Sequence, residues 1–101
     1  MAKRELRCDR VKRSNALVIW DDPSNPRGNR QKVRSHGLTE DEVESVLLDD
    51  DADVVPNRSY PEHCLVFGYT YTGRFIAVPW EILDDKHPVI RPITAFEPSD
   101  D

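Results

Sequence analysis

Long apolar stretches are missing from this sequence of 101 residues. No run approaches the roughly 18 consecutive apolar residues that a membrane-spanning helix requires, and the basic N-terminus lacks the apolar stretch of a secretory signal peptide. Apolar residues make up 38% of the chain, which is below the roughly 45–50% of typical soluble domains and still enough for a small core. We therefore expect one compact domain in the cytoplasm, without a membrane segment.

Cysteine is also scarce, since the chain has only Cys8 and Cys64. Two cysteines do not make the disulfide framework of a small secreted protein, and without a secretion signal we expect both to be reduced thiols. His63 and Cys64 are adjacent rather than spaced as a ligand pair, and His36 and His87 stand alone. The sequence therefore predicts no metal site and no cofactor.

The two parts of the chain differ in charge. Lys and Arg number 14 against 19 Asp and Glu, a net charge of −5, yet residues 1–36 are basic and residues 37–101 are strongly acidic. Such a split favours one face that attracts polyanions and another that repels them or contacts a basic partner, although ordinary solvated surface explains it equally well. We assign residues 1–15 to a flexible basic arm and residues 98–101 to an acidic tail.

The first half of the chain favours a short strand and two helices. A β-prone run at 17–20 ends in turn residues and prolines, and residues 27–36 then favour a helix that Gly37 ends with a left-handed cap. The second helix has the clearest signature, because Thr39 and Glu42 form a capping box at its start. An apolar stripe at helical spacing follows the box: Val43, Val46 and Leu47.

Beyond the helices the apolar pattern changes to a period of two. Residues 64–71, 75–82 and 89–96 favour strands joined by short turns, with Pro92 unable to donate to a ladder. Strands that follow one another through tight turns are antiparallel. We therefore predict one α+β domain over residues 16–97, in which two N-terminal helices pack on one face of an antiparallel sheet of about four strands.

Several short motifs follow one another in a recognisable order. They are Trp20-Asp21-Asp22-Pro23, Gly28-Asn29, His36-Gly37-Leu38-Thr39, Leu65-Val66-Phe67-Gly68, Gly73-Arg74 and Arg91-Pro92-Ile93-Thr94-Ala95. In order and spacing, over residues 17–96, they resemble the BrnT-type toxins, small ribonucleases of the RelE-like superfamily in bacterial type II toxin–antitoxin pairs. The resemblance implies a RelE-like fold and a metal-independent endoribonuclease. It also implies RNA as substrate and a cognate antitoxin, itself DNA-binding, as partner in a heterocomplex, with a homodimer as a further state.

Carried over position by position, the resemblance implies catalytic roles for five residues: His36, Glu42, Arg58, Arg74 and Arg91. It also implies RNA binding by Lys32, with Arg30 and Arg34 beside it. Cleavage of RNA without a metal needs a base for the 2′-hydroxyl proton, cations on the phosphate and an acid for the leaving oxygen. Arginine suits the phosphate because its guanidinium donates two parallel hydrogen bonds, which leaves Glu42 or His36 for proton transfer.

Each candidate also has a structural interpretation. His36 could cap the last carbonyls of the first helix, and the capping box already accounts for Glu42. Arg74 could be ordinary charge at a strand edge, and Arg91 could pair with the acidic residues at 84–85.

The chain departs from the family pattern in three places. Phe96 stands where the typical toxin has Arg, an acidic tail replaces a basic C-terminal segment, and the arm before Trp20 is longer. These departures favour an alternative, a non-catalytic protein-binding module that keeps the fold and the partner surface. A third hypothesis, metal-dependent hydrolysis, rests only on the acidic run at 49–53, and such runs are typical of solvated loops.

Overall fold

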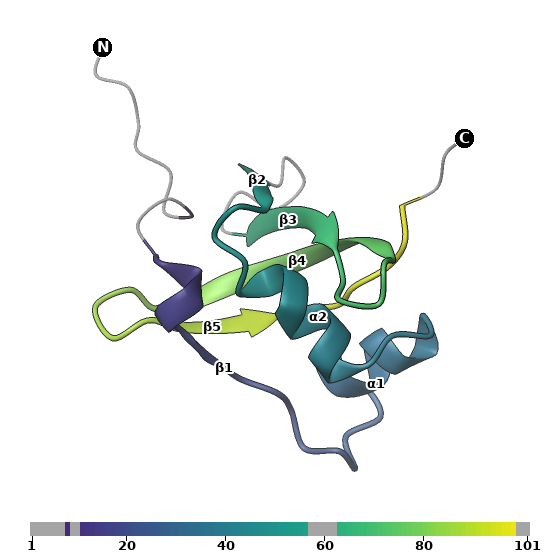
Figure 1. Cartoon of the computed structure of the whole chain (residues 1–101). Coiled ribbons are helices and arrows are strands. Elements are labelled where there is room, and N and C mark those ends of the chain that lie inside the picture. Colours follow the sequence, from purple (N-terminus) through teal and green to yellow (C-terminus); the bar gives the residue numbers. More distant parts are fainter. Residues whose placement is uncertain (1–7, 9–10, 57–62, 99–101) are drawn as a thin grey trace.

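The computed structural model describes residue 8 and residues 11–56 and 63–98. Within them the chain forms a 3-10 turn, two helices and five strands, in the order η2 (Arg13–Asn15), β1 (Leu17–Val18), α1 (Asn29–Ser35), α2 (Glu40–Leu47), β2 (Asp53–Pro56), β3 (His63–Tyr69), β4 (Phe75–Asp84) and β5 (Val89–Pro92). The strands make one sheet in the order β1-β5-β4-β3-β2 (Figure 1).

The expected α+β class is confirmed, and the sheet needs two corrections. The pairs β2–β3, β3–β4 and β4–β5 are antiparallel, but β1 runs parallel to β5. The described sheet is therefore five-stranded and mixed, rather than antiparallel with about four strands, and both helices follow β1. A parallel pair needs a long connection, and here both helices and three strands lie between the two partners.

The two helices are joined by a turn at Gly37, whose φ of 76° is readily adopted only by glycine. α1 is shorter than the expected 27–36, whereas α2 begins at the predicted capping box. The Thr39 hydroxyl accepts a hydrogen bond from the Glu42 N–H at 3.1 Å, and the Glu42 carboxylate accepts one from the Thr39 N–H at 3.0 Å. Within the described part of the chain, no helix is long and apolar enough to cross a membrane.

The core lies between α2 and one face of the sheet. α2 packs against β3 and β4 (Figure 1), and the predicted apolar stripe is buried. Alternate residues of the strands complete the core, and the buried side chains of α2, β3 and β4 include Val43, Val46, Leu47, Cys64, Val66, Ile76, Val78 and Trp80. The period of two puts the neighbouring side chains on the opposite face, where Tyr69 and Phe75 are 70% and 41% exposed.

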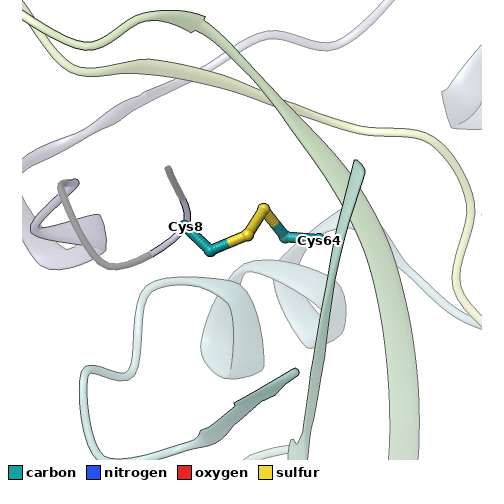
Figure 2. The surroundings of a disulfide bond; sticks show 2 residues. All are labelled: Cys8 and Cys64. Carbon is teal, nitrogen blue, oxygen red and sulfur yellow. A yellow bond between two sulfur atoms is a disulfide. The ribbon is translucent and has the colours of Figure 1, made fainter. Parts of the chain in front are cut away.

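Part of the N-terminal segment belongs to this core. Cys8 forms a disulfide with Cys64 of β3 (Figure 2), and Val11 is buried as well. The prediction of two reduced thiols is therefore wrong. The two cysteines are separated by 56 positions in the sequence, and only the packing of the N-terminal segment against β3 brings them together.

Arg13 anchors the same segment to α2. Its side chain is buried, with Nε donating to the carbonyl oxygen of Leu47 at 2.8 Å and Nη2 to that of Asp49 at 2.5 Å. Its guanidinium carbon lies 5.8 Å from the centroid of the Trp80 ring. Burial lowers the pKa of Arg13, and this effect is larger than that of the nearby charges of Asp50 and Asp49, which raise it. Arg13 thus satisfies carbonyl groups at the C-terminal end of α2.

Candidate functional site

The described candidate residues fall into two groups near opposite ends of β4. Arg74 directly precedes β4, whereas Arg91 of β5 faces Glu81 near the other end. Residues 74–81 span roughly 20 Å in an extended strand, so the structure does not bring Arg74 and Arg91 into one pocket. Arg58 lies outside the described residues. We call the groups the Arg74 cluster (His36, Glu42, Thr72, Arg74 and Glu97) and the Arg91 cluster (Asp21, Asn29, Glu81 and Arg91).

The hairpin turn between β3 and β4 positions Arg74. Gly73, with a φ of 90°, allows the tight turn, and the Thr70 hydroxyl accepts a hydrogen bond from the Arg74 N–H at 3.0 Å. The guanidinium then reaches the turn between the helices, where Nη1 donates to the carbonyl oxygen of Gly37 at 2.6 Å. Arg74 therefore ties the hairpin to the end of α1.

Two carboxylates face Arg74. Nη2 donates to Glu97 Oε1 at 2.7 Å, and Nη1 lies 3.7 Å from Glu42 Oε2. The two acids differ in exposure, since the Glu97 side chain is 53% exposed and the Glu42 side chain only 8%. The hydrogen bond between Arg74 and Glu97 raises the pKa of the arginine and lowers that of the acid.

Glu42 is fixed on both of its oxygens. Oε1 accepts the capping hydrogen bond from Thr39, and Oε2 accepts one from the Thr72 hydroxyl at 2.6 Å. The Thr72 hydrogen bond is the main cause of a lowered pKa of Glu42, with Thr39 and the charge of Arg74 adding to it and burial opposing it. The capping role that the sequence predicted is thus present, together with a second role under Arg74.

His36 joins this cluster from α1. It is the C-cap residue of α1, is exposed, and directly precedes Gly37, whose carbonyl binds Arg74. Its ring centroid lies 6.2 Å from that of Phe96. Arg74 of the hairpin therefore contacts Glu42 at the start of α2 and the carbonyl of Gly37, next to His36, whereas the ring contact of the His36 side chain is with Phe96.

Arg91 has different partners from those the sequence suggested. Nη1 donates to Glu81 Oε2 at 3.0 Å, while Nη2 and Nε donate to the Asp21 carboxylate at 2.6 and 3.3 Å. Pairing with the acids at 84–85 is therefore wrong, because the register sets Glu81 opposite Arg91. The hydrogen bond to Asp21 is the main cause of a raised pKa of Arg91, and the same bond lowers the pKa of Asp21.

Asn29 is the buried centre of the Arg91 cluster. Its side-chain oxygen accepts from the Asp21 N–H at 2.8 Å, and its amide donates to the carbonyl oxygens of Ile19 at 3.0 Å and Pro92 at 2.8 Å. Its own N–H donates to Asp21 Oδ2 at 2.8 Å. The start of α1, the segment after β1 and the end of β5 are thus joined through one fully buried side chain.

The basic residues of α1 divide into paired and unpaired. Arg30 and Arg34 each bind the Glu40 carboxylate of α2 at 2.8 Å. The pKa of Glu40 is lowered to about 2, and the hydrogen bond from Arg34 is the largest cause. Lys32 is exposed and has no ion pair with another described residue. It lies one helical turn before His36, so both side chains are on the same face of α1.

Sequence reasoning missed five members of these clusters: Asp21, Asn29, Thr72, Glu81 and Glu97. Asn29 stood in a family motif without a role, and its burial is the property that identifies it. Thr72 and Glu97 are contacts made by folding, because each reaches a partner more than twenty residues away in the sequence. For Thr72 the hairpin pattern before Gly73 was a signal; for Glu97 the sequence holds none that we recognise.

Comparison of the chain with models of protein families, with characterised proteins and with solved structures finds no match in any of the three. Among the described residues, no three His, Cys, Asp or Glu side chains are grouped so that they could hold a metal ion. The resemblance to the BrnT-type toxins therefore rests on the sequence motifs, and the function has to be argued from the two clusters.

Proposed function

We propose that the chain is a metal-independent endoribonuclease, the toxin of a type II toxin–antitoxin pair, and that its reactive centre is the Arg74 cluster. The observation that carries this proposal is that Arg74 contacts both the Glu42 carboxylate and the carbonyl of Gly37, the residue directly after His36. A group that exchanges protons near neutral pH and a cation for the phosphate are what such cleavage requires. RNA is then the substrate, an antitoxin the protein partner and the cytoplasm the place of action.

In this proposal Arg74 binds the phosphate of the bond to be cut. His36 removes the proton of the 2′-hydroxyl, whose oxygen attacks the adjacent phosphorus. The bond from phosphorus to the 5′-oxygen then breaks, and the leaving oxygen takes a proton from water. The products are a 2′,3′-cyclic phosphate and a 5′-hydroxyl, and Arg74 stabilises the charge that builds up on the phosphate oxygens.

Glu42 acts through Arg74 rather than on the RNA. Its carboxylate is almost completely buried and its oxygens accept hydrogen bonds from Thr39 and Thr72. Its lowered pKa makes it a weak base, whereas a fixed negative charge 3.7 Å from Nη1 holds the guanidinium in place. Of the two proton-transfer candidates, His36 is therefore the catalytic residue and Glu42 a positioning residue.

The RNA strand follows α1 in this proposal. Lys32 and His36 lie on one exposed face of the helix, one turn apart, and the turn after His36 contacts Arg74. These three side chains give a short path for a phosphodiester backbone. Arg30 and Arg34 contribute less, because both are paired with the same carboxylate of α2.

Cleavage of RNA by the purified full chain in the presence of a chelator tests the proposal. We expect products that end in a cyclic phosphate, and a loss in kcat/KM of about 10²–10³-fold for Arg74→Ala and of about 10²–10⁴-fold for His36→Ala. Arg27→Ala is the matched control, because it removes an exposed arginine outside both clusters, and its rate should equal that of the wild type. Intact RNA after incubation with folded wild-type protein would refute the proposal.

A second candidate function, a non-catalytic protein-binding module, is favoured by the ion pairs. Arg74 and Arg91 each face two carboxylates, so that in each cluster the acids outnumber the arginine, whereas a phosphate prefers an excess of positive charge. Such a module would bind a basic protein through the acidic part of the chain. A stable complex with the product of a neighbouring gene, without RNA cleavage, would support it over the ribonuclease.

A further inference from the structure

The two acids at Arg74 are not equivalent. Glu42 is buried and hydrogen-bonded to Thr39 and Thr72, and it therefore cannot leave without disturbing the start of α2. Glu97 is 53% exposed and lies just beyond Phe96, whose bridge to Ala77 is the last pairing with the sheet among the described residues. Its carboxylate takes a hydrogen bond only from Arg74 among the described residues. Glu97 is thus the exchangeable partner of this arginine.

We propose that Glu97 is an internal competitor, whose carboxylate occupies the position on Arg74 Nη2 that a phosphate of a bound RNA strand takes. This inference rests on the proposed function, since it concerns the same arginine. A carboxylate and a phosphate both present oxygens to the same donors of a guanidinium. The strand therefore binds only when the Glu97 side chain moves away, and the C-terminal segment sets how readily the cluster accepts RNA.

The geometry makes this exchange feasible. The Arg74 side chain is 31% exposed, so that it is partly accessible to a ligand. Its Nη1 is already fixed by the Gly37 carbonyl at 2.6 Å, so that the arginine stays in place when Nη2 changes partner. An exposed ion pair of this kind stabilises little, and a ligand with several phosphates can displace it.

The sharpest test measures binding apart from chemistry, with a 2′-O-methylated RNA 12-mer that cannot be cut because it lacks the attacking hydroxyl. Glu97→Gln removes the competing charge and should tighten binding of this probe by about two- to fivefold, as expected for an exposed pair. Glu81→Gln is the matched control: it neutralises an acid paired with the other arginine, Arg91, and should change the affinity less. The gain from Glu97→Gln should disappear when Arg74→Ala is added.

Each outcome separates this inference from the proposed function. Equal gains for Glu97→Gln and Glu81→Gln, a gain that survives Arg74→Ala, or no binding of the probe by any variant would overturn the inference. RNA cleavage that depends on Arg74 but is unaffected by Glu97→Gln would do so too and would leave the ribonuclease standing. A gain in binding through Arg74 without any cleavage of unmodified RNA would keep the inference and refute the ribonuclease.

Discussion

Arg74 and Arg91, near opposite ends of β4, each lie between two carboxylates, but the carboxylates are held differently in the two clusters. In the Arg91 cluster both are fixed, Glu81 by the strand register and Asp21 by the buried Asn29. In the Arg74 cluster one of them, Glu97, is an exposed side chain at the end of the described chain. The same pairing of charges thus joins segments firmly in the Arg91 cluster, whereas in the Arg74 cluster it leaves Glu97 as a partner that a ligand can replace.

The disulfide strengthens the Arg91 end. Cys64 pairs in register with Trp80, and Trp80 with Pro92, next to the row that contains Glu81 and Arg91. The covalent bond, the buried amide and the fixed ion pairs are therefore concentrated at one end of the sheet. A surface suited to binding is therefore marked by an arginine whose partners can be exchanged, rather than by the presence of an arginine alone.

Breaking the disulfide should give the largest effect on stability. The bridge joins residues 56 positions apart, and the loss of a loop of that size lowers the free energy of unfolding by about 4 kcal/mol. Urea denaturation with and without dithiothreitol measures this, and Cys8→Ser serves as a control that should not respond to the reductant. RNA binding by the reduced, folded protein should be unchanged, and a loss of binding would contradict the independence of the two ends.

Asn29→Ala should have the next largest effect. The substitution removes three side-chain hydrogen bonds in a fully buried place, and the unsatisfied groups left behind cost about 3 kcal/mol of unfolding free energy. Asn25→Ala is the matched control, because Asn25 is exposed and accepts one local bond from the Arg27 N–H. If Asn29→Ala and Asn25→Ala lower the free energy of unfolding equally in urea denaturation, the buried amide of Asn29 does not hold these segments together.

Replacing each arginine by alanine compares the two clusters directly. Arg91→Ala should lower the free energy of unfolding by about 2 kcal/mol, because Asp21 and Glu81 lose a partly buried charged partner. Arg74→Ala should change stability less, because its pair with Glu97 is exposed, while lowering kcat/KM for RNA cleavage by about 10²–10³-fold. Thermal denaturation and cleavage assays on both variants check this. A larger loss of stability for Arg74→Ala together with a larger loss of cleavage for Arg91→Ala would contradict the prediction.

The pH dependence of stability should give the smallest effect. Arg91 and Asn29 lower the pKa of Asp21 below its usual 3.8, so its contribution is fully present above about pH 4 and is lost as the pH falls through the lowered pKa. Asp21→Asn should remove this acid-dependent part, about 1 kcal/mol for a partly exposed pair. Glu97→Gln should leave the slope below pH 4 nearly unchanged. Urea denaturation between pH 2 and pH 6 would contradict this if both variants gave the same slope.

The best predictions from the sequence concern local structure. Thr39 and Glu42 predicted the start of α2, and Gly37 predicted the end of α1, because capping depends on residues a few positions apart. β2 was missed because the acidic run before it dominates the pattern, although Val54 and Val55 favour a strand. The parallel pairing of β1 could not be predicted, because a two-residue strand carries no signal for its partner.

The candidate site was predicted in part. Arg74 contacts Glu42 and the backbone next to His36, but Arg91 lies near the other end of β4 among acids of its own. Sequence spacing cannot tell the two arginines apart, because Arg74 adjoins the β3–β4 hairpin and Arg91 belongs to the β4–β5 hairpin, two neighbouring antiparallel pairs of the same kind. Only the register and the direction of each side chain decide which acids they face.

The amino-acid order by itself determined the helix caps, the period of the strands and the separation of basic from acidic residues, since these follow from neighbours along the chain. The tertiary structure alone decided the bond between Cys8 and Cys64, the burial of Asn29 and the pairing of Arg74 with Glu97. The physical reason is that these contacts join distant segments. Their free energy depends on which faces the packed core brings together, and no local pattern encodes that choice.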